Sequence, residues 1–169
     1  LLSSKDIISD AYENGVPMGS DLILKEDQSP SFFIWAAKDP RKTSLQRIQI
    51  IKGWVEDGEG KEEVIDVACS DGLSVDPDTN RCPDNEATVD LTTCEITPDK
   101  GAKELSVVWR DNNFSQDQRA FYYVRVLENP TCRWSTYDAI RAGVQPRPGM
   151  KATIQDRAWS SPIWYQPNT

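Results

Sequence analysis

The side chains whose spacing most suggests a binding site lie in one acidic loop. Four oxygen-bearing side chains fall at positions 1, 3, 5 and 9 of an EF-hand-like spacing, namely Asp76, Asp78, Asn80 and Asp84. However, Arg81 stands where the motif needs glycine, and Ala87 stands where it needs a bidentate glutamate. The calcium motif is therefore incomplete. The interpretation that we prefer is a solvated, proline-braced loop tied down by Cys82, with no metal site.

Aromatic side chains offer a second kind of chemistry, because six Trp and five Tyr can form a platform on which sugars stack. Three tryptophans belong to the alternating apolar positions of predicted strands and are therefore expected in the core: Trp35, Trp54 and Trp109. Three others border loops or a predicted edge strand and are expected to be freer: Trp134, Trp159 and Trp164. An exposed cluster of the second set would indicate a binding surface.

Carboxylates could also act in pairs as general acid and base, but their separation cannot be read from the sequence. The candidates on or beside predicted strands are Glu63, Asp66, Glu128 and Asp156. We prefer a structural role, in which Arg125 and Arg133 pair with acidic side chains. The chain contains no histidine, so it has no imidazole base and lacks the commonest transition-metal ligand. We therefore predict no catalytic residue and no cofactor.

The cysteine pattern predicts disulfides in an exported protein. Cys69, Cys82, Cys94 and Cys132 form an even set without a CxxC pair, which argues against a zinc ribbon or a thioredoxin-type motif. Four buried free thiols in a cytosolic protein are the alternative. Of the possible pairings we favour Cys69–Cys82 with Cys94–Cys132, because turn residues can close the first loop locally. Cys82–Cys94 with Cys69–Cys132 competes with it. The expected location is periplasmic or secreted.

The overall composition limits the possible partners. A chain of 169 residues can support one ordinary core, and its net charge of −8 argues against nucleic acid, whose phosphates carry the same sign. No apolar run approaches the ~20 residues that a membrane-spanning helix needs. The chain begins LLSSKD without methionine, and we expect it to be a piece of a longer protein.

The stretch from Arg119 to Gly143 is the centre of the predicted architecture. Apolar side chains on both faces of its first part predict a central strand, which Asn129-Pro130 ends because proline has no N–H for the ladder. A short helix follows, with Ser135 as the expected N-cap and Gly143 just past its end.

The remaining elements surround this strand. A helix is expected over Ser3–Asn14, a loop or linker over Val16–Pro30, and one helical turn capped by Ser115. Further strands are expected over Ser31–Lys38, Leu45–Val55, Val64–Cys69, Ala87–Ile96, Lys103–Arg110 and Arg157–Gln166, the last at an edge because of Pro162. The sequence Glu56-Asp57-Gly58-Glu59-Gly60 is the expected turn of a hairpin between the second and third of these strands. The predicted fold is mainly β: an antiparallel β-sandwich-like domain over residues 31–169 with two accessory helices, preceded by a helix and linker over residues 1–30.

Several segments of the sequence resemble segments of a known family and occur in the same order. They are GVPMGSDL, FIWAAKDP, LQRIQIIKGWV, QRAFYYVRVLENPTCRWSTYDA and RAWSSPIWY. Together they resemble the C-terminal region of a bacterial domain-of-unknown-function family, number 3604. The resemblance implies exported, longer proteins whose N-terminal part is similar to PHP-type metal-dependent phosphoesterases. The histidine and aspartate ligands of that part have no counterpart in this sequence.

Three hypotheses follow for the function. The first is a non-catalytic C-terminal domain that packs against a metallohydrolase domain of the same polypeptide, which predicts an apolar docking face near Ile7, Ile8 and Tyr12 or over Val16–Leu22. The second is a free-standing ligand- or carbohydrate-binding module, which predicts a concave aromatic site instead. The third, an autonomous enzyme, conflicts with the absence of histidine.

Overall fold

The computed structural model describes residues 7–25 and 28–167 and is mainly β with two helices, as the sequence predicts. The elements follow the chain in this order: α1 Ile7–Asn14, β1 Asp21–Leu22, β2 Ser31–Ala37, β3 Leu45–Glu56, β4 Glu59–Cys69, β5 Glu104–Arg110, β6 Ala120–Glu128, β7 Thr131–Cys132, α2 Trp134–Ala142, β8 Thr153–Ile154, β9 Arg157–Trp159 and β10 Ile163–Tyr165. The helix expected over Ser3–Asn14 is present as α1, and its predicted first residues, 3–6, lie outside the described residues.

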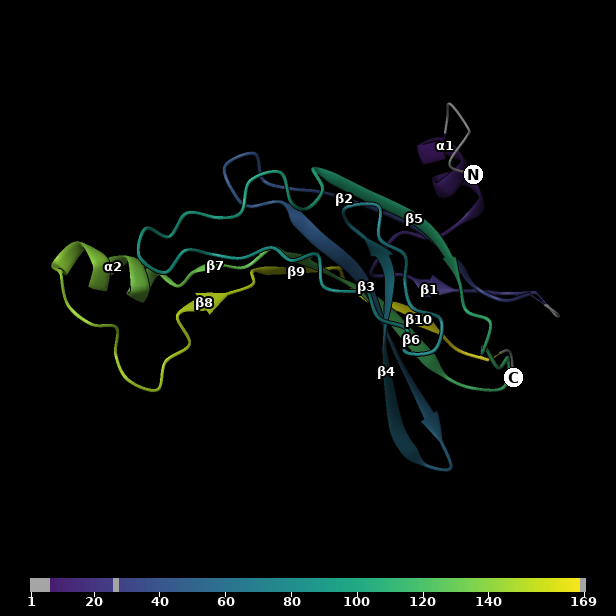
Figure 1. The fold of residues 1–169 in the computed structure, drawn as a ribbon. Coiled ribbons are helices and arrows are strands. Elements are labelled where there is room, and N and C mark those ends of the chain that lie inside the picture. The colour runs from purple at the N-terminus through teal and green to yellow at the C-terminus, as the bar shows by residue number, and fades with distance from the viewer. Residues whose placement is uncertain (1–6, 26–27, 168–169) are drawn as a thin grey trace.

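The strands form one large sheet and two strand pairs (Figure 1). The large sheet has the order β1-β10-β6-β3-β4, and β9 also pairs with β6. All of its pairings are antiparallel except that of β1 with β10. The pair β2-β5 covers one face of this sheet, which gives a sandwich-like arrangement of two unequal layers. As predicted, β6 is central, with β3 on one side and β9 and β10 on the other.

The hairpin β3-β4 is the longest paired unit, and its turn follows from local backbone chemistry. Glu56 pairs with Glu59, so the loop is Asp57-Gly58, and both loop residues have positive φ (52° and 80°). A two-residue loop with two positive φ values matches the right-handed twist of the strands, and Asp-Gly adopts it readily. The predicted hairpin is confirmed.

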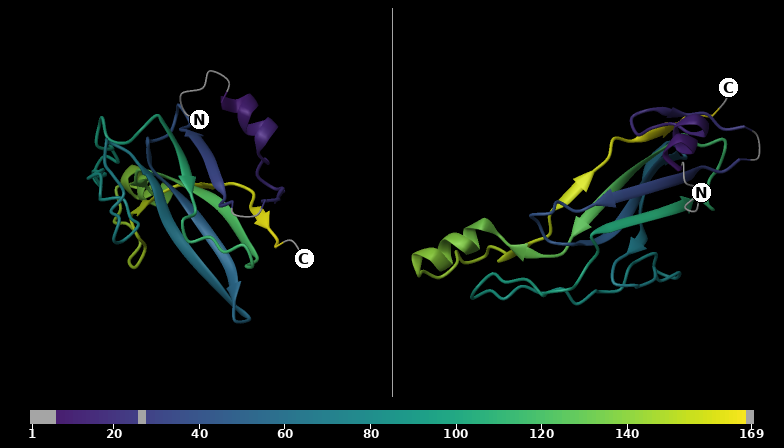
Figure 2. Two further views of the ribbon diagram at one scale, coloured as in Figure 1. Left: turned by 90° about the vertical axis from the view of Figure 1, so that its right-hand side faces the viewer. Right: turned by 90° about the horizontal axis from the view of Figure 1, so that it is seen from above.

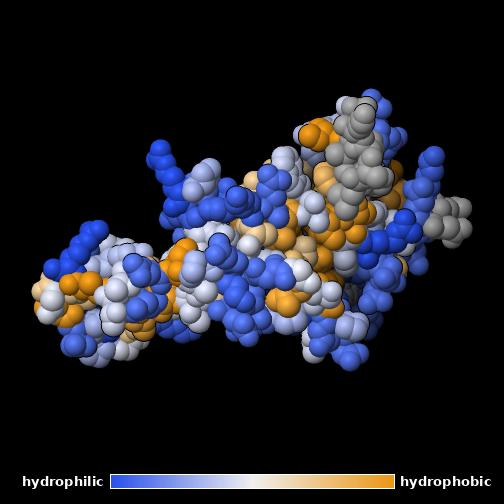
Figure 3. Space-filling view, turned by 45° about the horizontal axis from the view of Figure 1, so that its top comes forward, coloured by the Kyte–Doolittle hydropathy of each residue, from blue (hydrophilic) through white to orange (hydrophobic). Residues whose placement is uncertain are grey.

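The core lies between the two layers. Its buried members come from β2, β3 and β6: Phe32, Ile34, Ile48, Ile50, Ala120 and Tyr122. The partly buried side chains Leu105, Val107 and Trp109 of β5 pack on this cluster, as their alternation predicts. Apolar surface is concentrated at the end of the molecule that carries both layers (Figure 3).

An arm extends from the sandwich and is held by covalent links. It consists of α2, the pair β7-β8 and the long loop between β4 and β5 (Figures 1 and 2). Two disulfides are present, as predicted: Cys69–Cys82 closes a loop at the end of β4, and Cys94–Cys132 ties the long loop to β7. This is the pairing that we favoured. No helix within residues 7–25 and 28–167 is long and apolar enough to cross a bilayer.

The start of α2 differs from the prediction. Arg133, not Ser135, is the N-cap, and no side chain caps the helix. The reason is that β7 continues directly into the helix: the Arg133 N–H donates to the Ala152 carbonyl, and the Arg133 carbonyl accepts the Thr136 N–H. The predicted end is confirmed, because Gly143 adopts the left-handed conformation (φ 63°) and its N–H returns to the helix.

Two predicted segments between the helices also differ from the structure. The strand expected over Ala87–Ile96 is absent from the described chain and is replaced by a single Val89–Ile96 bridge. Asp90 accepts the N–H and hydroxyl of Thr92, which turns the backbone before a ladder can form. The segment around Ser115 forms turns without a helix.

The two ends of the chain are more closely tied to the large sheet than predicted. The segment Val16–Pro30, expected as a loop, contains β1, which pairs with β10. The closing strand is split into β9 and β10 by Ser160–Pro162, so only β9 is an edge strand there while β10 lies between β1 and β6. Proline interrupts the ladder because it lacks an N–H.

Candidate functional site

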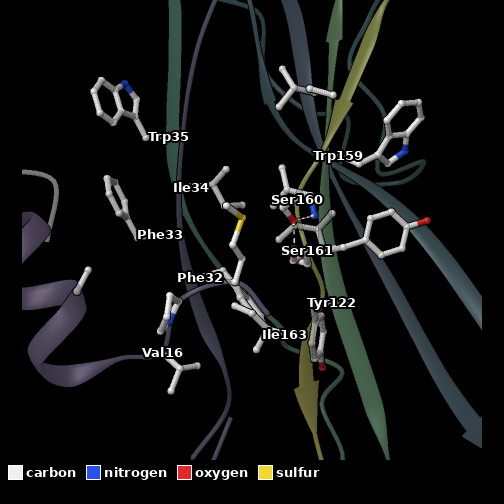
Figure 4. A pocket seen from close by; sticks show the side chains of 18 of the residues that line it. Val16, Phe32, Phe33, Ile34, Trp35, Tyr122, Trp159, Ser160, Ser161 and Ile163 are labelled. Atoms are coloured by element: carbon white, nitrogen blue, oxygen red, sulfur yellow. Dashed lines mark hydrogen bonds between the residues drawn. The ribbon is translucent and has the colours of Figure 1, made fainter. Parts of the chain in front are cut away.

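The most apolar concavity is a groove of about 560 Å3 along the open side of the sandwich. One wall is β2 together with α1 and the residues that follow it, and the other is β6 with β9 and β10. Figure 4 shows Ile34 leaving β2 on one side while Phe33 and Trp35 leave it on the other. Trp159, Ser160 and Ser161 lie on the facing layer (Figure 4). We call this concavity the apolar groove.

The apolar groove exists because the two layers differ in width. The pair β2-β5 has two strands, whereas the large sheet has six, so part of the inner face of β6 stays uncovered. As a result, Tyr122, Val124 and Val126 belong both to the core and to the lining of the groove. A sheet face without a covering layer is unusual, because burying apolar surface stabilises the folded state by about 25 cal/mol per Å2.

The first helix adds further apolar surface beside the groove. Ala11 and Tyr12 of α1 and Met18 after it line the groove, and the side chain of Tyr12 is 70% exposed. Ile8 on the same helix is also exposed. These exposures agree with the docking face expected near Ile8, Tyr12 and Val16–Leu22, whereas the side chain of Ile7 lies outside the described residues.

The lining of the groove is mostly apolar, with a few uncharged polar groups. Among the described residues that form it, none carries a charge, and the polar members are tyrosine, tryptophan and serine side chains. Ser160 is used structurally: its Oγ accepts the Val124 N–H at 2.9 Å and donates to the Ser161 carbonyl. Ser160 thereby replaces the ladder contact that is lost between β9 and β10. The described lining residues include no histidine, carboxylate or lysine that could act as a base toward a nucleophile.

A buried polar group lies on the core side of Tyr122. The Tyr122 hydroxyl donates to Asp111 Oδ2 at 2.7 Å, and Lys52 Nζ lies 2.6 Å from the same oxygen. Lys52 also donates to the Asn113 carbonyl. Burial and, next, the hydrogen bond to Asp111 raise the pKa of Tyr122 far above its usual value. Tyr122 therefore stays neutral and fixes one wall of the groove.

The acidic loop uses its side chains to hold its own backbone. Asp76 Oδ1 accepts the N–H groups of Thr79 and Asp78, and these bonds lower the pKa of Asp76. Asp84 Oδ1 accepts the Glu86 N–H. No group of three or more His, Cys, Asp or Glu side chains within residues 7–25 and 28–167 is arranged to hold a metal. These contacts brace the loop, and the disulfide with Cys69 ties down Cys82 within it.

The tryptophans are distributed differently from the prediction in one case. Trp54 and Trp109 pack against the core as expected, but Trp35 is exposed and donates to Glu104 Oε2 at 3.3 Å. The reason is that Trp35 alternates with the buried Ile34 on β2, so its side chain leaves the strand on the side away from the core (Figure 4). The tryptophans expected to be freer are all exposed: Trp134, Trp159 and Trp164. No ring contact joins any two of them in the described part of the chain.

The structure brings two of the carboxylate candidates together: burial and, next, the charge of nearby Asp156 raise the pKa of Glu128. The others are used in structural contacts. Asp66 is 2% exposed, accepts hydrogen bonds from Gln49 Nε2 and the Cys82 N–H, and lies 3.6 Å from both Arg47 and Arg81. It therefore anchors the loop closed by Cys69–Cys82. The side chain of Glu63 accepts from Asn80 Nδ2, and Asp156 pairs with Lys42.

Arg125 and Arg133, which were expected to pair with acids, form no ion pair with a described residue. Arg125 Nε donates to Gln49 Oε1 at 2.7 Å, so it reaches Asp66 only through that amide. Arg133 forms no ion pair within the described ranges, and its Nε is buried without a hydrogen-bond partner there. The strand geometry explains Arg125, because Gln49 is directly opposite it on β3.

Two polar groups were missed by reasoning from the sequence. One is the Lys52–Asp111–Tyr122 group. The sequence feature that could have indicated it is a lysine between Ile51 and Gly53 in an otherwise apolar strand. The other is Asn85, which is 3% exposed and bonds to Ser70, Asp71, Gln46 and Asn129. Asn85 lies in a polar loop and carries no local signal of its burial.

Comparison with known proteins gives one family match. The family described as "Protein of unknown function (DUF3604)" matches residues 1–167. No curated protein matches the chain, and no solved structure matches it.

Proposed function

This chain belongs to the DUF3604 family, and we propose that it is a non-catalytic, β-rich docking domain of an exported protein. In this proposal the chain forms the C-terminal part of a longer polypeptide, and its partner is a domain that resembles a PHP-type metal-dependent hydrolase. The observation that carries the proposal is the apolar groove, where core side chains of β6 reach the surface beside the exposed side chains of α1.

The shape of the groove supports an apolar protein surface as its occupant. Its lining is aromatic and aliphatic, without a charged group among the described residues. In addition, β5 is the one strand that pairs with β2 within the described residues, so the second edge of β2 faces the groove. Such an edge, next to an apolar channel, suits a packed protein segment that supplies both side chains and backbone partners.

The position of α1 supports a partner from the same polypeptide. Tyr12 and Met18 line the groove, so a domain joined to the N-terminal side of α1 would emerge beside it. A covalently joined partner has a high effective concentration at the groove, which lets a modest interface remain occupied. Exposed apolar surface of this kind is normally covered in the working protein.

The proposed non-catalytic role and location rest on composition and covalent chemistry. The sequence holds no histidine, and the lining residues that the structure describes include no carboxylate, lysine or arginine. Two disulfides indicate that the chain folds in an oxidising environment. The periplasm or the extracellular space is the simplest such environment, so the proposed location is periplasmic or secreted.

Hydrogen exchange tests the docking proposal directly. The full-length protein should protect the amides of residues 8–18 and 31–37 at least about tenfold relative to the isolated chain, because the partner covers them. The double variant Tyr12→Glu with Met18→Glu should abolish this protection in the full-length protein. Val144→Glu, an equally exposed apolar position on the arm, is the matched control and should leave it unchanged. Equal exchange in the full-length protein and the isolated chain would refute the proposal.

A further inference from the structure

A second concavity, of about 730 Å3, lies at the root of the arm and has the opposite chemistry. Its walls come from the start of β3, the loop closed by Cys69–Cys82 and the segment from β8 to β9. Four cationic side chains line it: Arg47, Arg133, Lys151 and Arg157. We call it the cationic pocket.

The charge of the cationic pocket contrasts with that of the whole chain. Four cations and one acid, Asp84, line it, although the protein carries a net charge of −8. Within the described ranges Arg133, Lys151 and Arg157 form no ion pair, and the Nε of Arg133 is buried without a hydrogen-bond partner. Only Arg47 approaches an acid, at 3.6 Å from Asp66. Unpaired cations that share a concavity create a positive potential that attracts an anion.

The floor of the pocket is fixed by buried amides. Gln46 Oε1 accepts from Arg47 Nη1 at 2.6 Å and from Gln155 Nε2 at 2.9 Å. On its other side, Gln46 Nε2 donates to Asn85 Oδ1 at 3.0 Å, and both residues are buried. Because these partners hold Gln46 in place, the guanidinium of Arg47 is positioned before any ligand arrives.

The rim carries an aromatic side chain. Trp159 lines the cationic pocket and is 59% exposed, so its ring is available to a ligand. A tryptophan face gives a sugar ring a flat apolar surface, and guanidinium groups match the geometry of carboxylate and sulfate. The combination of cations, amides and one aromatic ring is what an acidic sugar needs.

We propose that the cationic pocket binds an anionic oligosaccharide, with its carboxylate or sulfate among Arg47, Arg133, Lys151 and Arg157 and a sugar ring on Trp159. Polymeric nucleic acid is disfavoured as the ligand because the rest of the surface is acidic. Trp159 borders both concavities, but the four cationic side chains line the cationic pocket and not the apolar groove. This proposal therefore does not depend on docking at the groove.

Isothermal titration calorimetry at low and high salt tests this inference with the folded chain. The probes are an oligogalacturonate, a sulfated oligosaccharide of similar length, a neutral oligosaccharide and inorganic sulfate. We expect one of the two acidic sugars to bind, with an affinity that falls as salt rises, and the neutral sugar and sulfate to bind at least about tenfold more weakly. The acidic probe that binds identifies the anion as carboxylate or sulfate.

Exposed side chains provide the variants, so that folding is preserved. Arg157→Ala and Lys151→Ala should each weaken binding of the acidic sugar about tenfold. Trp159→Ala should weaken binding of the acidic sugar but not binding of inorganic sulfate. Arg119→Ala removes an equally exposed cation outside the pocket and should have no effect. Tyr12→Glu with Met18→Glu should also leave sugar binding intact, which separates this site from the docking groove. Failure of both acidic sugars to bind, or binding that these pocket variants do not change, would overturn the proposal.

Discussion

Lys52 Nζ and Asp111 Oδ2 lie 2.6 Å apart in the interior of the sandwich, and both side chains are only 4% exposed. The pair joins the centre of β3 to the residue that follows β5, and thus links the two layers. Its charges are balanced by further groups: the Asn113 carbonyl accepts from Lys52, and the Tyr122 hydroxyl donates to Asp111. The rings of Trp54 and Tyr122 lie 5.3 and 5.9 Å from Lys52 Nζ.

Breaking this pair from one side should be strongly destabilising. Lys52→Met keeps the length of the side chain but leaves the carboxylate of Asp111 buried without its cation. We expect a loss of about 3–5 kcal/mol in the free energy of unfolding, measured by urea denaturation. Lys61→Met removes the lysine of an exposed pair with Glu59 and should cost no more than about 1 kcal/mol. Similar losses in the two variants would show that the buried pair is not a main link between the layers.

Gly53 is required by a cross-strand ring. It pairs with Phe121 in the register of β3 and β6, and a Cβ at position 53 would lie 2.3 Å from the ring of Phe121. Gly53→Ala should therefore destabilise the protein by about 1–3 kcal/mol, because the ring must move. Gly60→Ala on β4 meets open space and should change stability by less than about 0.5 kcal/mol.

A double-mutant cycle separates the clash from other effects of Gly53→Ala. Phe121→Ala removes the ring and should make the added methyl group at position 53 harmless. The two substitutions together should then cost clearly less than the sum of their separate costs in thermal or urea unfolding. Additive costs would place the strain somewhere other than the Gly53–Phe121 contact.

The disulfides should differ in what they hold together. Cys69–Cys82 spans 13 residues and Cys94–Cys132 spans 38. Paired Cys→Ser substitution should cost about 3 kcal/mol for the first bridge and slightly more for the second on the chain-entropy argument. Loss of Cys94–Cys132 should also increase amide exchange in residues 87–98, which loss of the first bridge should leave unchanged. Non-reducing peptide mapping checks the pairing, and four alkylatable thiols in the native protein would exclude both bridges.

The sequence predicted the parts of the fold that depend on local chemistry. The Asp57-Gly58 turn, the β3-β4 hairpin, the end of α2 at Gly143 and the strand at β6 all follow from nearby residues. The exposure of Trp134, Trp159 and Trp164 also followed, because they border loops or chain breaks.

The features that the sequence could not predict depend on how the layers of the sandwich pack against each other. Trp35 has the alternation of a core residue, yet the two-stranded layer leaves its side of β2 open. The partners of Lys52 come from Asp111 and Asn113, some sixty residues away, so their proximity is set by the tertiary fold. The cationic pocket joins residues of β3, β9 and the arm in the same way, and no segment alone carries its pattern.

The proposed non-catalytic role predicts the absence of hydrolysis. The purified chain should not cleave phosphoester substrates above background with Mg2+, Mn2+ or Zn2+, because it has no histidine and no group of three or more His, Cys, Asp or Glu side chains within residues 7–25 and 28–167 could hold a metal. The full-length protein, assayed in parallel, is the positive comparison. Metal-dependent turnover that persists through repurification of this chain would contradict the docking-domain proposal.

Glu128 should make the protein less stable as the pH rises. Its Oε2 is buried without a hydrogen-bond partner among the described residues. Burial and, next, the nearby charge of Asp156 raise the pKa of Glu128 above its usual value, against smaller opposing effects from Lys42 and Lys38. The folded state therefore holds the proton on Glu128 more tightly than the unfolded chain does.

The direction of the pH effect follows from this difference in proton binding. The stabilising contribution of protonated Glu128 is complete below the unfolded pKa, about 4.5, and is lost as the pH rises through the higher folded pKa. Glu128→Gln keeps the neutral form at every pH, so its melting temperature should exceed that of the unmodified protein at pH 7 and match it below about pH 4. Glu62→Gln, at an exposed position of β4, should show no such divergence. If the melting temperatures of Glu128→Gln and the unmodified protein agree at both pH values, ionisation of the buried Glu128 carboxyl does not destabilise the folded state.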